Sequence, residues 1–281
     1  MPLRALNIPT LLRQFNLHPD KSLGHNFLVD EGALAKVAAA AEIGPEDTVL
    51  EIGPGLGSLT RHLAVAARRV VAVELDEGLL PALTAVLKPH ANVEVVQGDI
   101  LNLPLPSLGL PPGYKVAANI PYYITSAVIR HLLEAENRPV RIVLTVQREV
   151  AERLCAQPGD MSVLAVSVQF YSVPRIVGRI PAGAFYPRPK VDSAVVRLDV
   201  LPRRAVEVKD SEVFFRVVRA GFSQKRKQLR NALSGGLQLS GERVAAWLAR
   251  AGLDPRRRAE TLALEEWGSL AETLEKPDQT A

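Results

Sequence analysis

The tetrapeptide Asn119-Ile120-Pro121-Tyr122 carries groups that can hold an amino group attached to a flat ring. It follows an apolar run, residues 114–118, that is typical of a buried strand, so it should lie where that strand ends. The amide oxygen of Asn119 and the backbone carbonyl of Ile120 or Pro121 can accept hydrogens from such an amino group. Tyr122 can then stack on the ring. This chemistry suits methyl transfer to the exocyclic nitrogen of adenine, although Asn and Pro also occur in ordinary turns that end a strand.

A glycine-rich loop, Gly53-Pro54-Gly55-Leu56-Gly57, follows a second apolar strand at residues 48–52. Glycines let the backbone turn sharply into the next helix and approach a ligand closely. The spacing G-x-G-x-G differs from the G-x-G-x-x-G of dinucleotide sites and favours S-adenosylmethionine over NAD. A dinucleotide oxidoreductase would share only this loop and the acid that ends the next strand.

Acidic residues end the next two predicted strands. Glu74 ends the strand at 69–74, about 20 residues beyond the glycine loop, where a carboxylate can accept hydrogen bonds from both ribose hydroxyls. Asp99 follows the strand at 93–97 and can accept from the adenine amino group of a cofactor. Both are also compatible with solvated acids at strand ends.

Positive charge is concentrated in the last part of the chain. Residues 201–281 contain 15 Lys and Arg against 11 Asp and Glu, whereas residues 1–200 contain 19 of each. The cations form two clusters: Lys225, Arg226, Lys227 and Arg230 at the start of a predicted helical stretch, and Arg256, Arg257 and Arg258 in a predicted loop. Such clusters can neutralise RNA phosphates, or they can be solvated surface.

Strand and helix patterns alternate through most of the chain, which predicts an α/β fold with a mostly parallel sheet and the ligand at the carboxyl ends of its strands. The expected strands are 48–52, 69–74, 93–97, 114–118 and 140–146, and the expected helices are 31–42, 58–67, 77–88 and 124–135. Residues 169–180 and 191–200 predict a final antiparallel pair joined by a loop containing Phe185. From residue 211 the spacing is helical, so we predict a main domain at 1–204 and a small all-α domain at 205–281.

Composition narrows the class of protein. A single cysteine, Cys155, argues against a disulfide framework and fits a reducing cytoplasm. The five histidines show no spacing typical of metal ligands, so we expect no metal. The first residues lack the basic start and apolar segment of a signal peptide, and no apolar run is long enough to cross a bilayer.

Over nearly its whole length the chain resembles the small-subunit ribosomal RNA dimethyladenosine transferases. The resemblance rests on five segments: residues 21–28, 51–57, 119–122, 185–193 and 222–231. Related large-subunit enzymes that confer macrolide resistance share the first four in similar form, so the fifth separates the two groups. The sequence departs from the family pattern at residues 159–163 and at His25, where Gln is more usual and where we expect a neutral loop residue.

The resemblance implies a Rossmann-like class I S-adenosylmethionine-dependent methyltransferase that dimethylates N6 of two adjacent adenines in a hairpin near the 3′ end of 16S rRNA during small-subunit assembly. It implies these cofactor contacts: Asn26, Leu28, Gly53, Gly55, Glu74, Asp99 and Asn119. It also places Asn119, Pro121 and Tyr122 at the target base, with Phe185 facing Tyr122 across it.

We therefore expect a cytoplasmic monomer that acts on 16S rRNA in the small subunit or its precursor, without contact to a membrane. The cluster at residues 225–230 is the expected RNA-binding element. Two other functions remain open. A methyltransferase acting on adenine in large-subunit rRNA or DNA would share the motifs up to Ser193, and a non-catalytic nucleic-acid-binding factor of the same fold would keep the basic tail without needing Asn119.

Overall fold

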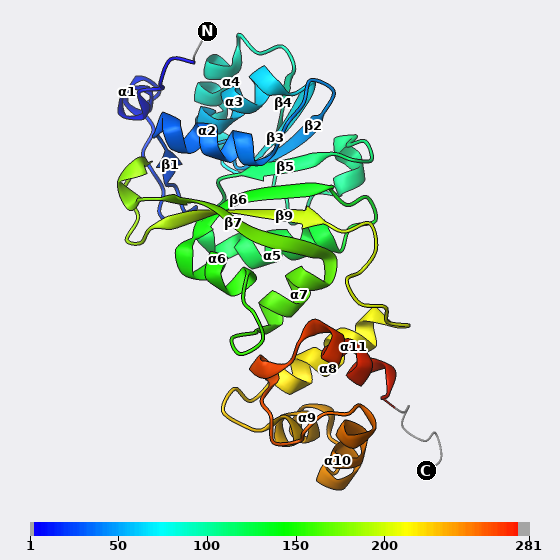
Figure 1. The fold of residues 1–281 in the computed structure, drawn as a ribbon. Coiled ribbons are helices and arrows are strands. Elements are labelled where there is room, and N and C mark those ends of the chain that lie inside the picture. The colour runs from blue at the N-terminus through cyan, green and yellow to red at the C-terminus, as the bar shows by residue number, and fades with distance from the viewer. Residues whose placement is uncertain (1–2, 275–281) are drawn as a thin grey trace. The chain divides into compact units, whose positions relative to one another are not determined.

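The computed structural model describes residues 3–274 and divides the chain into two compact units (Figure 1). The first unit consists of Met1–Glu152 and Val173–Pro202, and the second of Arg153–Ser172 and Arg203–Ala281. The chain therefore enters the second unit twice. The later crossing lies close to the predicted boundary at residue 204, whereas the sequence analysis assigned residues 153–172 to the main domain.

A seven-stranded sheet with the order β4-β3-β2-β5-β6-β9-β7 forms the centre of the first unit. Its strands are β2 (Thr48–Ile52), β3 (Arg69–Glu74), β4 (Val93–Gln97), β5 (Lys115–Ala118), β6 (Arg141–Gln147), β7 (Ser172–Ile180) and β9 (Ser193–Val200). Strands β2 to β6 are parallel, and β9 runs antiparallel to β6. The central strands are buried and rich in Val and Ile, as expected for a sheet that is covered on both faces.

Short elements surround this sheet. The helices are α1 (Ile8–Gln14), α2 (Glu31–Ala40), α3 (Ser58–Ala66), α4 (Leu80–Leu87), α5 (Thr125–Leu133) and α6 (Arg148–Leu154), which ends just past the first crossing between the units. The 3-10 turns are η1 (Glu77–Leu79), η2 (Leu105–Leu108), η3 (Tyr122–Ile124) and η4 (Ala182–Ala184). Two further strands, β1 (Phe27–Leu28) and β8 (Phe185–Tyr186), pair with each other in an antiparallel sense.

The chain reverses its direction across the sheet between β2 and β5. From β2 it proceeds to β3 and β4, and it then returns to β5 and proceeds the other way to β6. Because such crossovers are right-handed, α3 and α4 cover one face of the sheet and α5 covers the other. Sheets of this kind bind ligands outside the carboxyl ends of their strands at this reversal. The glycine loop and Asn119 directly follow the two strands concerned.

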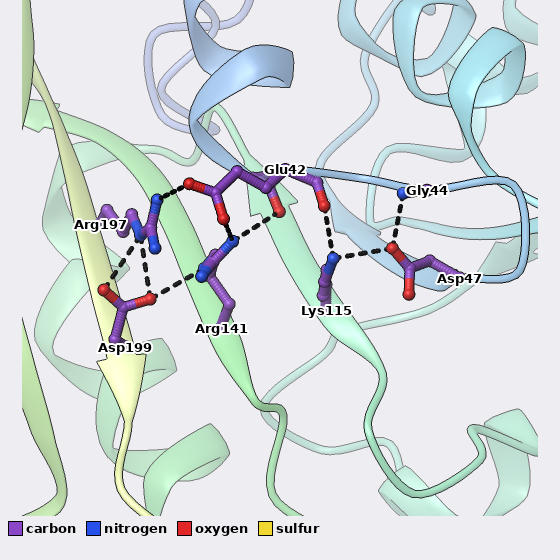
Figure 2. A network of polar contacts seen from close by, with 8 residues as sticks. Glu42, Gly44, Asp47, Lys115, Arg141, Arg197 and Asp199 are labelled. Atoms are coloured by element: carbon purple, nitrogen blue, oxygen red, sulfur yellow. Dashed lines mark hydrogen bonds and ion pairs between the residues drawn. The ribbon is translucent and has the colours of Figure 1, made fainter.

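A polar network holds the amino ends of the parallel strands, at the sheet edge opposite to that reversal. It joins six side chains: Glu42, Asp47, Lys115, Arg141, Arg197 and Asp199 (Figure 2). The carboxylate of Glu42, just after α2, accepts from Arg141 at 2.6 Å and also from Arg197. Arg141 donates in addition to Asp199 at 2.8 Å. The network thereby ties the end of α2 to β6 and β9.

The second unit is helical in its described part. It consists of α7 (Val163–Tyr171), α8 (Ser211–Phe222), α9 (Leu229–Leu237), α10 (Gly241–Arg250) and α11 (Leu264–Glu272), with the 3-10 turn η5 (Ala259–Thr261). Aromatic side chains fill its core. The rings of Phe170 and Phe214 stack at 4.5 Å between centroids, and the buried Trp247 donates its indole N–H to the carbonyl of Leu270 at 3.1 Å.

The parallel strands and their connecting helices lie within a few residues of their predicted bounds. The prediction was wrong for residues 169–171, which were expected in a strand and belong to α7. Ser162 begins this helix, since its hydroxyl accepts from the N–H of Ala165 at 3.2 Å. Phe170 then packs in the core of the second unit. Phe170 and Tyr171 are residue types that favour strands, and packing against α8 outweighed that propensity.

Candidate active site

A cavity of about 320 Å³ lies in the first unit at the carboxyl ends of the parallel strands, where the chain reverses its direction between β2 and β5. The seven residues that the sequence predicted as cofactor contacts all line it: Asn26, Leu28, Gly53, Gly55, Glu74, Asp99 and Asn119. Its size is at the lower end of the range for small-molecule sites, roughly 300–1,000 Å³. The fold therefore assembles one site from segments that are far apart in the sequence.

The glycine loop forms one wall of this cavity. Gly53 and Gly55 have φ angles of +68° and +59°, which side chains other than glycine rarely adopt. The backbone N–H of Gly55 donates to Oε2 of Glu74 at 2.9 Å. A Cβ atom at Gly55 would stand 3.0 Å from the ring of Phe27, so only glycine allows β1 to approach this closely.

Two carboxyl groups of the cavity are buried, with 5% of Glu74 and 1% of Glu51 exposed. Burial raises the pKa of both, and the pKa of Glu51 reaches about 8, to which the nearby Glu74 adds. Oε2 of Glu51 has no hydrogen-bond partner among residues 3–274, so it can bind a polar or cationic group of a ligand. Glu51 was not predicted as a site residue, although a charged residue inside an apolar strand was a usable signal.

Loop hydrogen bonds orient the other polar residues of the cavity. Asp99 accepts from the N–H of Leu101 at 3.0 Å and from the amide of Asn102 at 2.7 Å. Nδ1 of His25 accepts from the N–H of Asp20 at 3.0 Å, which leaves Nε2 directed towards Asp76 at 3.6 Å. His25 lines the cavity as a loop residue, as expected.

The amide of Asn119 has an orientation that its neighbour fixes. Its Nδ2 donates to the backbone carbonyl of Asn26 at 3.1 Å, and a carbonyl oxygen can only accept, so the nitrogen must face it. Among residues 3–274 no group donates to the amide oxygen of Asn119, so this oxygen can accept from another group. Gly24 packs on the same motif, because a Cβ atom there would stand 2.7 Å from Cβ of Pro121. The loop before β1 and the Asn119 motif therefore form one connected wall.

The aromatic residues lie differently from the prediction. Phe185 was expected in a loop, facing Tyr122 across a base, but it lies in β8 opposite Leu28, and only 4% of it is exposed. Its ring packs in the apolar core with residues such as Leu34, so in this conformation it offers no open face to a base. The hydroxyl of Tyr122 lies 2.8 Å from that of Ser193, which fixes its ring beside β9. Tyr123, which the sequence analysis did not select, lines the cavity and is 64% exposed.

The first basic cluster lies on the second unit. Lys225, Arg226 and Lys227 are in the loop between α8 and α9, which corrects the predicted helical stretch, and only Arg230 lies on a helix. All four side chains are exposed. Within residues 3–274 the three loop cations have no acidic partner, whereas Nε of Arg230 donates to the carbonyl of Gly241 at 3.0 Å.

The second basic cluster adjoins the first. The N–H of Leu229 donates to the carbonyl of Arg257 at 2.7 Å, and the N–H of Arg230 donates to that of Pro255 at 3.3 Å. These bonds bring the loop at 255–258 to the start of α9. Arg257 forms an ion pair with Glu266, so part of the charge of this second cluster is neutralised within the unit.

In the part of the chain that the structure describes, no group of three His, Cys, Asp or Glu side chains is placed to hold a metal ion. No helix among those residues is long and apolar enough to cross a membrane.

Comparison with known proteins assigns the chain to a family. The family model described as ribosomal RNA adenine dimethylase matches residues 16–276. The chain belongs to the ribosomal RNA adenine dimethylase family. A protein of Dehalococcoides mccartyi described as ribosomal RNA small subunit methyltransferase A is 48% identical over 278 residues, which are 96% of this chain and 95% of that relative.

Solved structures show the same fold for this dimethylase family member. A crystal structure of the 23S rRNA methyltransferase ErmE is 33% identical with a TM-score of 0.72 and covers 89% of this chain and 100% of its own. That of a dimethyladenosine transferase from Plasmodium falciparum is 25% identical with a TM-score of 0.73, and it covers 87% of this chain and 95% of its own. The predicted α/β methyltransferase fold is thus confirmed.

Proposed function

We propose that this dimethylase family member transfers methyl groups from S-adenosylmethionine to N6 of two adjacent adenines in a hairpin near the 3′ end of 16S rRNA, as a cytoplasmic monomer during assembly of the small ribosomal subunit. The observation that carries the proposal is the fixed amide of Asn119, a residue that lines the cavity. The similarity to a small subunit methyltransferase A at 48% identity supports the choice of substrate.

The residues of the cavity fit S-adenosylmethionine. This cofactor supplies an electrophilic methyl group on a sulfonium centre. Oε2 of buried Glu51, which has no partner among residues 3–274, suits the polar or cationic end of such a ligand. The absence of a side chain at Gly55 allows the ligand to approach the backbone. Glu74, whose carboxylate is aligned by the N–H groups of Gly55 and Asp76, would accept from ribose hydroxyls. Asp99 would accept from the adenine amino group.

Asn119 and the carbonyl of Ile120 or Pro121 would hold the target base by accepting both hydrogens of its amino group. These bonds draw the nitrogen lone pair out of the ring and orient it towards the methyl group, so positioning accounts for most of the catalysis. No residue has to remove a proton beforehand, because the methylated nitrogen becomes acidic and loses its proton to water. The adenine must be swung out of its stack to reach the site, and the ring of Tyr122 would support it.

One experiment separates the candidate functions. The purified protein is incubated with labelled S-adenosylmethionine and, in parallel, with undermethylated small subunits, large subunits or DNA. We expect label only in 16S rRNA, as dimethyladenosine in the digested RNA. Label in large subunits or DNA would favour the related methyltransferases, and binding of subunits without any label would favour a non-catalytic factor.

The basic cluster of the second unit provides a separate prediction about RNA docking. Because its loop cations have no acidic partner among the described residues, they are available to phosphates and should contribute to binding whatever the RNA sequence. The variant carries four changes to Gln: Lys225, Arg226, Lys227 and Arg230. It should bind small subunits more weakly, with a slope of log affinity against log salt that is flatter by roughly 0.7–0.9 for each phosphate that the protein no longer neutralises.

A matched variant controls for the change of four charges. It replaces four exposed cations of the first unit by Gln: Arg13, Lys36, Arg68 and Lys88. We expect this variant to keep most of the salt slope, and both variants to keep the affinity for S-adenosylmethionine. An unchanged slope in the variant at residues 225–230 would show that this cluster is only solvated surface.

A further inference from the structure

A second cavity, of about 180 Å³, lies in the first unit at the end of β6. It is lined by Gln147, Arg148, Glu149, Val191 and Asp192. One water occupies about 30 Å³ in the liquid, so the cavity has room for a group the size of a nucleobase. Nothing in the mechanism described above uses these residues.

Strand register places this cavity beside Tyr122. Gln147, the last residue of β6, is directly opposite Ser193, the first residue of β9. Side chains of directly opposed residues lie on the same face of the sheet, about 4.5–5.5 Å apart at their Cβ atoms. The hydroxyl of Ser193 is in turn 2.8 Å from that of Tyr122. The side chain of Gln147 therefore lies on the face of the sheet where Tyr122 is anchored.

The parallel neighbour of β6 is β5, which leads into Asn119. Both strands have their carboxyl ends at the same edge of the sheet. Asn119 at the end of β5 and Gln147 at the end of β6 thus flank the position of Tyr122. A nucleotide that follows or precedes a base held by Asn119 would pass over this edge.

The polar groups of the second cavity suit a base better than a phosphate. The amide of Gln147 makes no hydrogen bond to another described residue, and a Gln amide can pair with N6 and N7 of adenine through one acceptor and one donor. The carboxylates of Glu149 and Asp192 would repel a phosphate, whereas they attract an exocyclic amino group. The guanidinium of Arg148 lies 3.7 Å from Glu152, one turn along α6.

We propose that this cavity receives the base of the nucleotide next to the target adenine, and that Gln147 reads it as adenine. The proposal rests on the proposed function, since it requires an RNA substrate with two adjacent adenines. Gln147 acts here as a specificity-determining residue that contacts the neighbouring base and not the reacting atoms. A pocket of this kind would keep the second adenine in place while the first is modified.

The test uses small subunits reassembled with 16S rRNA in which one of the two adjacent adenines is either retained or replaced by uridine. Single-turnover methylation of the remaining adenine is measured for the wild type, Gln147→Ala and Gln147→Glu. The exposed Gln14→Ala, on α1, is the matched control. Glutamate keeps the shape of glutamine but cannot donate to N7, so both Gln147 variants should behave alike. Calorimetry with S-adenosylmethionine verifies that each variant keeps a folded cofactor site.

We expect the wild type and Gln14→Ala to lose roughly 5- to 150-fold in rate when the neighbour becomes uridine, the range for one good base contact. On the substrate with a neighbouring adenine, the Gln147 variants should be slower than the wild type by a similar factor. Replacing that neighbour by uridine should not lower their rate any further. The proposal would be overturned if Gln147→Ala still preferred the adenine substrate over the uridine substrate by the wild-type factor. It would also be overturned if the variant lost rate equally on both substrates. Failure of the wild type to methylate any small subunit would instead refute the proposed function.

Discussion

The buried carboxyl of Glu51 should make the stability of the first unit depend on pH. Its pKa is about 8 in the folded chain, against 4.5 for an ordinary Glu. Between these values the unfolded chain loses a proton that the folded chain keeps, so the free energy of unfolding falls as pH rises, by up to about 1.4 kcal/mol per pH unit. Between pH 5 and 8 this linkage amounts to roughly 3 kcal/mol.

The change Glu51→Gln preserves the shape of the protonated group and removes its ionisation. The free energy of unfolding of the variant should therefore lack the decline that Glu51 causes. The difference in this free energy between the variant and the wild type should grow with pH in favour of the variant. Both tryptophans, Trp247 and Trp267, belong to the second unit, so tryptophan fluorescence would not report unfolding of the first unit. Amide hydrogen exchange of β2 and β3, measured without cofactor, is therefore the suitable measurement. Glu136→Gln, at an exposed site of the first unit, is the control for loss of a carboxyl. Parallel declines of the wild type and Glu51→Gln would refute the reasoning.

Three further predictions follow from the same contacts. Asn119→Ala should fold normally yet lower turnover more than tenfold, a loss of about 1.4 kcal/mol or more, whereas Asn137→Ala, which removes a comparable bond at 2.9 Å outside the cavity, should not; normal turnover of Asn119→Ala would contradict the assignment. Glu74→Ala should weaken S-adenosylmethionine binding by about 1–3 kcal/mol in calorimetry with RNA affinity retained, and an unchanged cofactor affinity would exclude the role of Glu74. Hydrogen bonds from Arg197 and then Arg141 lower the pKa of Glu42 below its ordinary value of 4.5, so the stabilisation is fully present above that value and is lost as the pH falls through the lowered pKa. The free energies of unfolding of Glu42→Gln and the wild type, measured in denaturant, should therefore converge on acidification below pH 4.5, and a difference that stays constant over that range would be inconsistent with this.

The polar residues of the site could be predicted because their positions follow from local rules. A parallel strand shows its end in the sequence as a change from Val, Ile and Ala to Gly, Asn or an acid, and the carboxyl ends of all such strands meet at one edge. Glu74, Asp99 and Asn119 each follow that rule, and all three line the cavity. The registers of β2 with β3 and β5, and of β3 with β4, then bring the three residues together.

The aromatic residues could not be placed by the same rules. The pairing of β8 with β1 buries Phe185, and two-residue strands leave no periodic pattern in the sequence. A tyrosine pair at 122–123 gives no indication of which ring faces the ligand, because the backbone turns there in a single 3-10 turn. The hydrogen bond between Tyr122 and Ser193, 71 residues away, holds Tyr122 beside β9, and it is Tyr123 that lines the cavity.

The two basic clusters lie together because the backbone N–H groups at the start of α9 need hydrogen-bond acceptors. The first N–H groups of any helix lack partners within the helix, and the residue before α9, Gln228, provides no side-chain cap. The carbonyls of Pro255 and Arg257 accept from two of these groups instead. These hydrogen bonds at the start of α9 thus hold the loop with the arginines at 256–258 next to the cations at 225–230. Because backbone atoms make these bonds, replacing the arginine side chains at 256–258 should alter the charge of this surface without moving the loop that forms it.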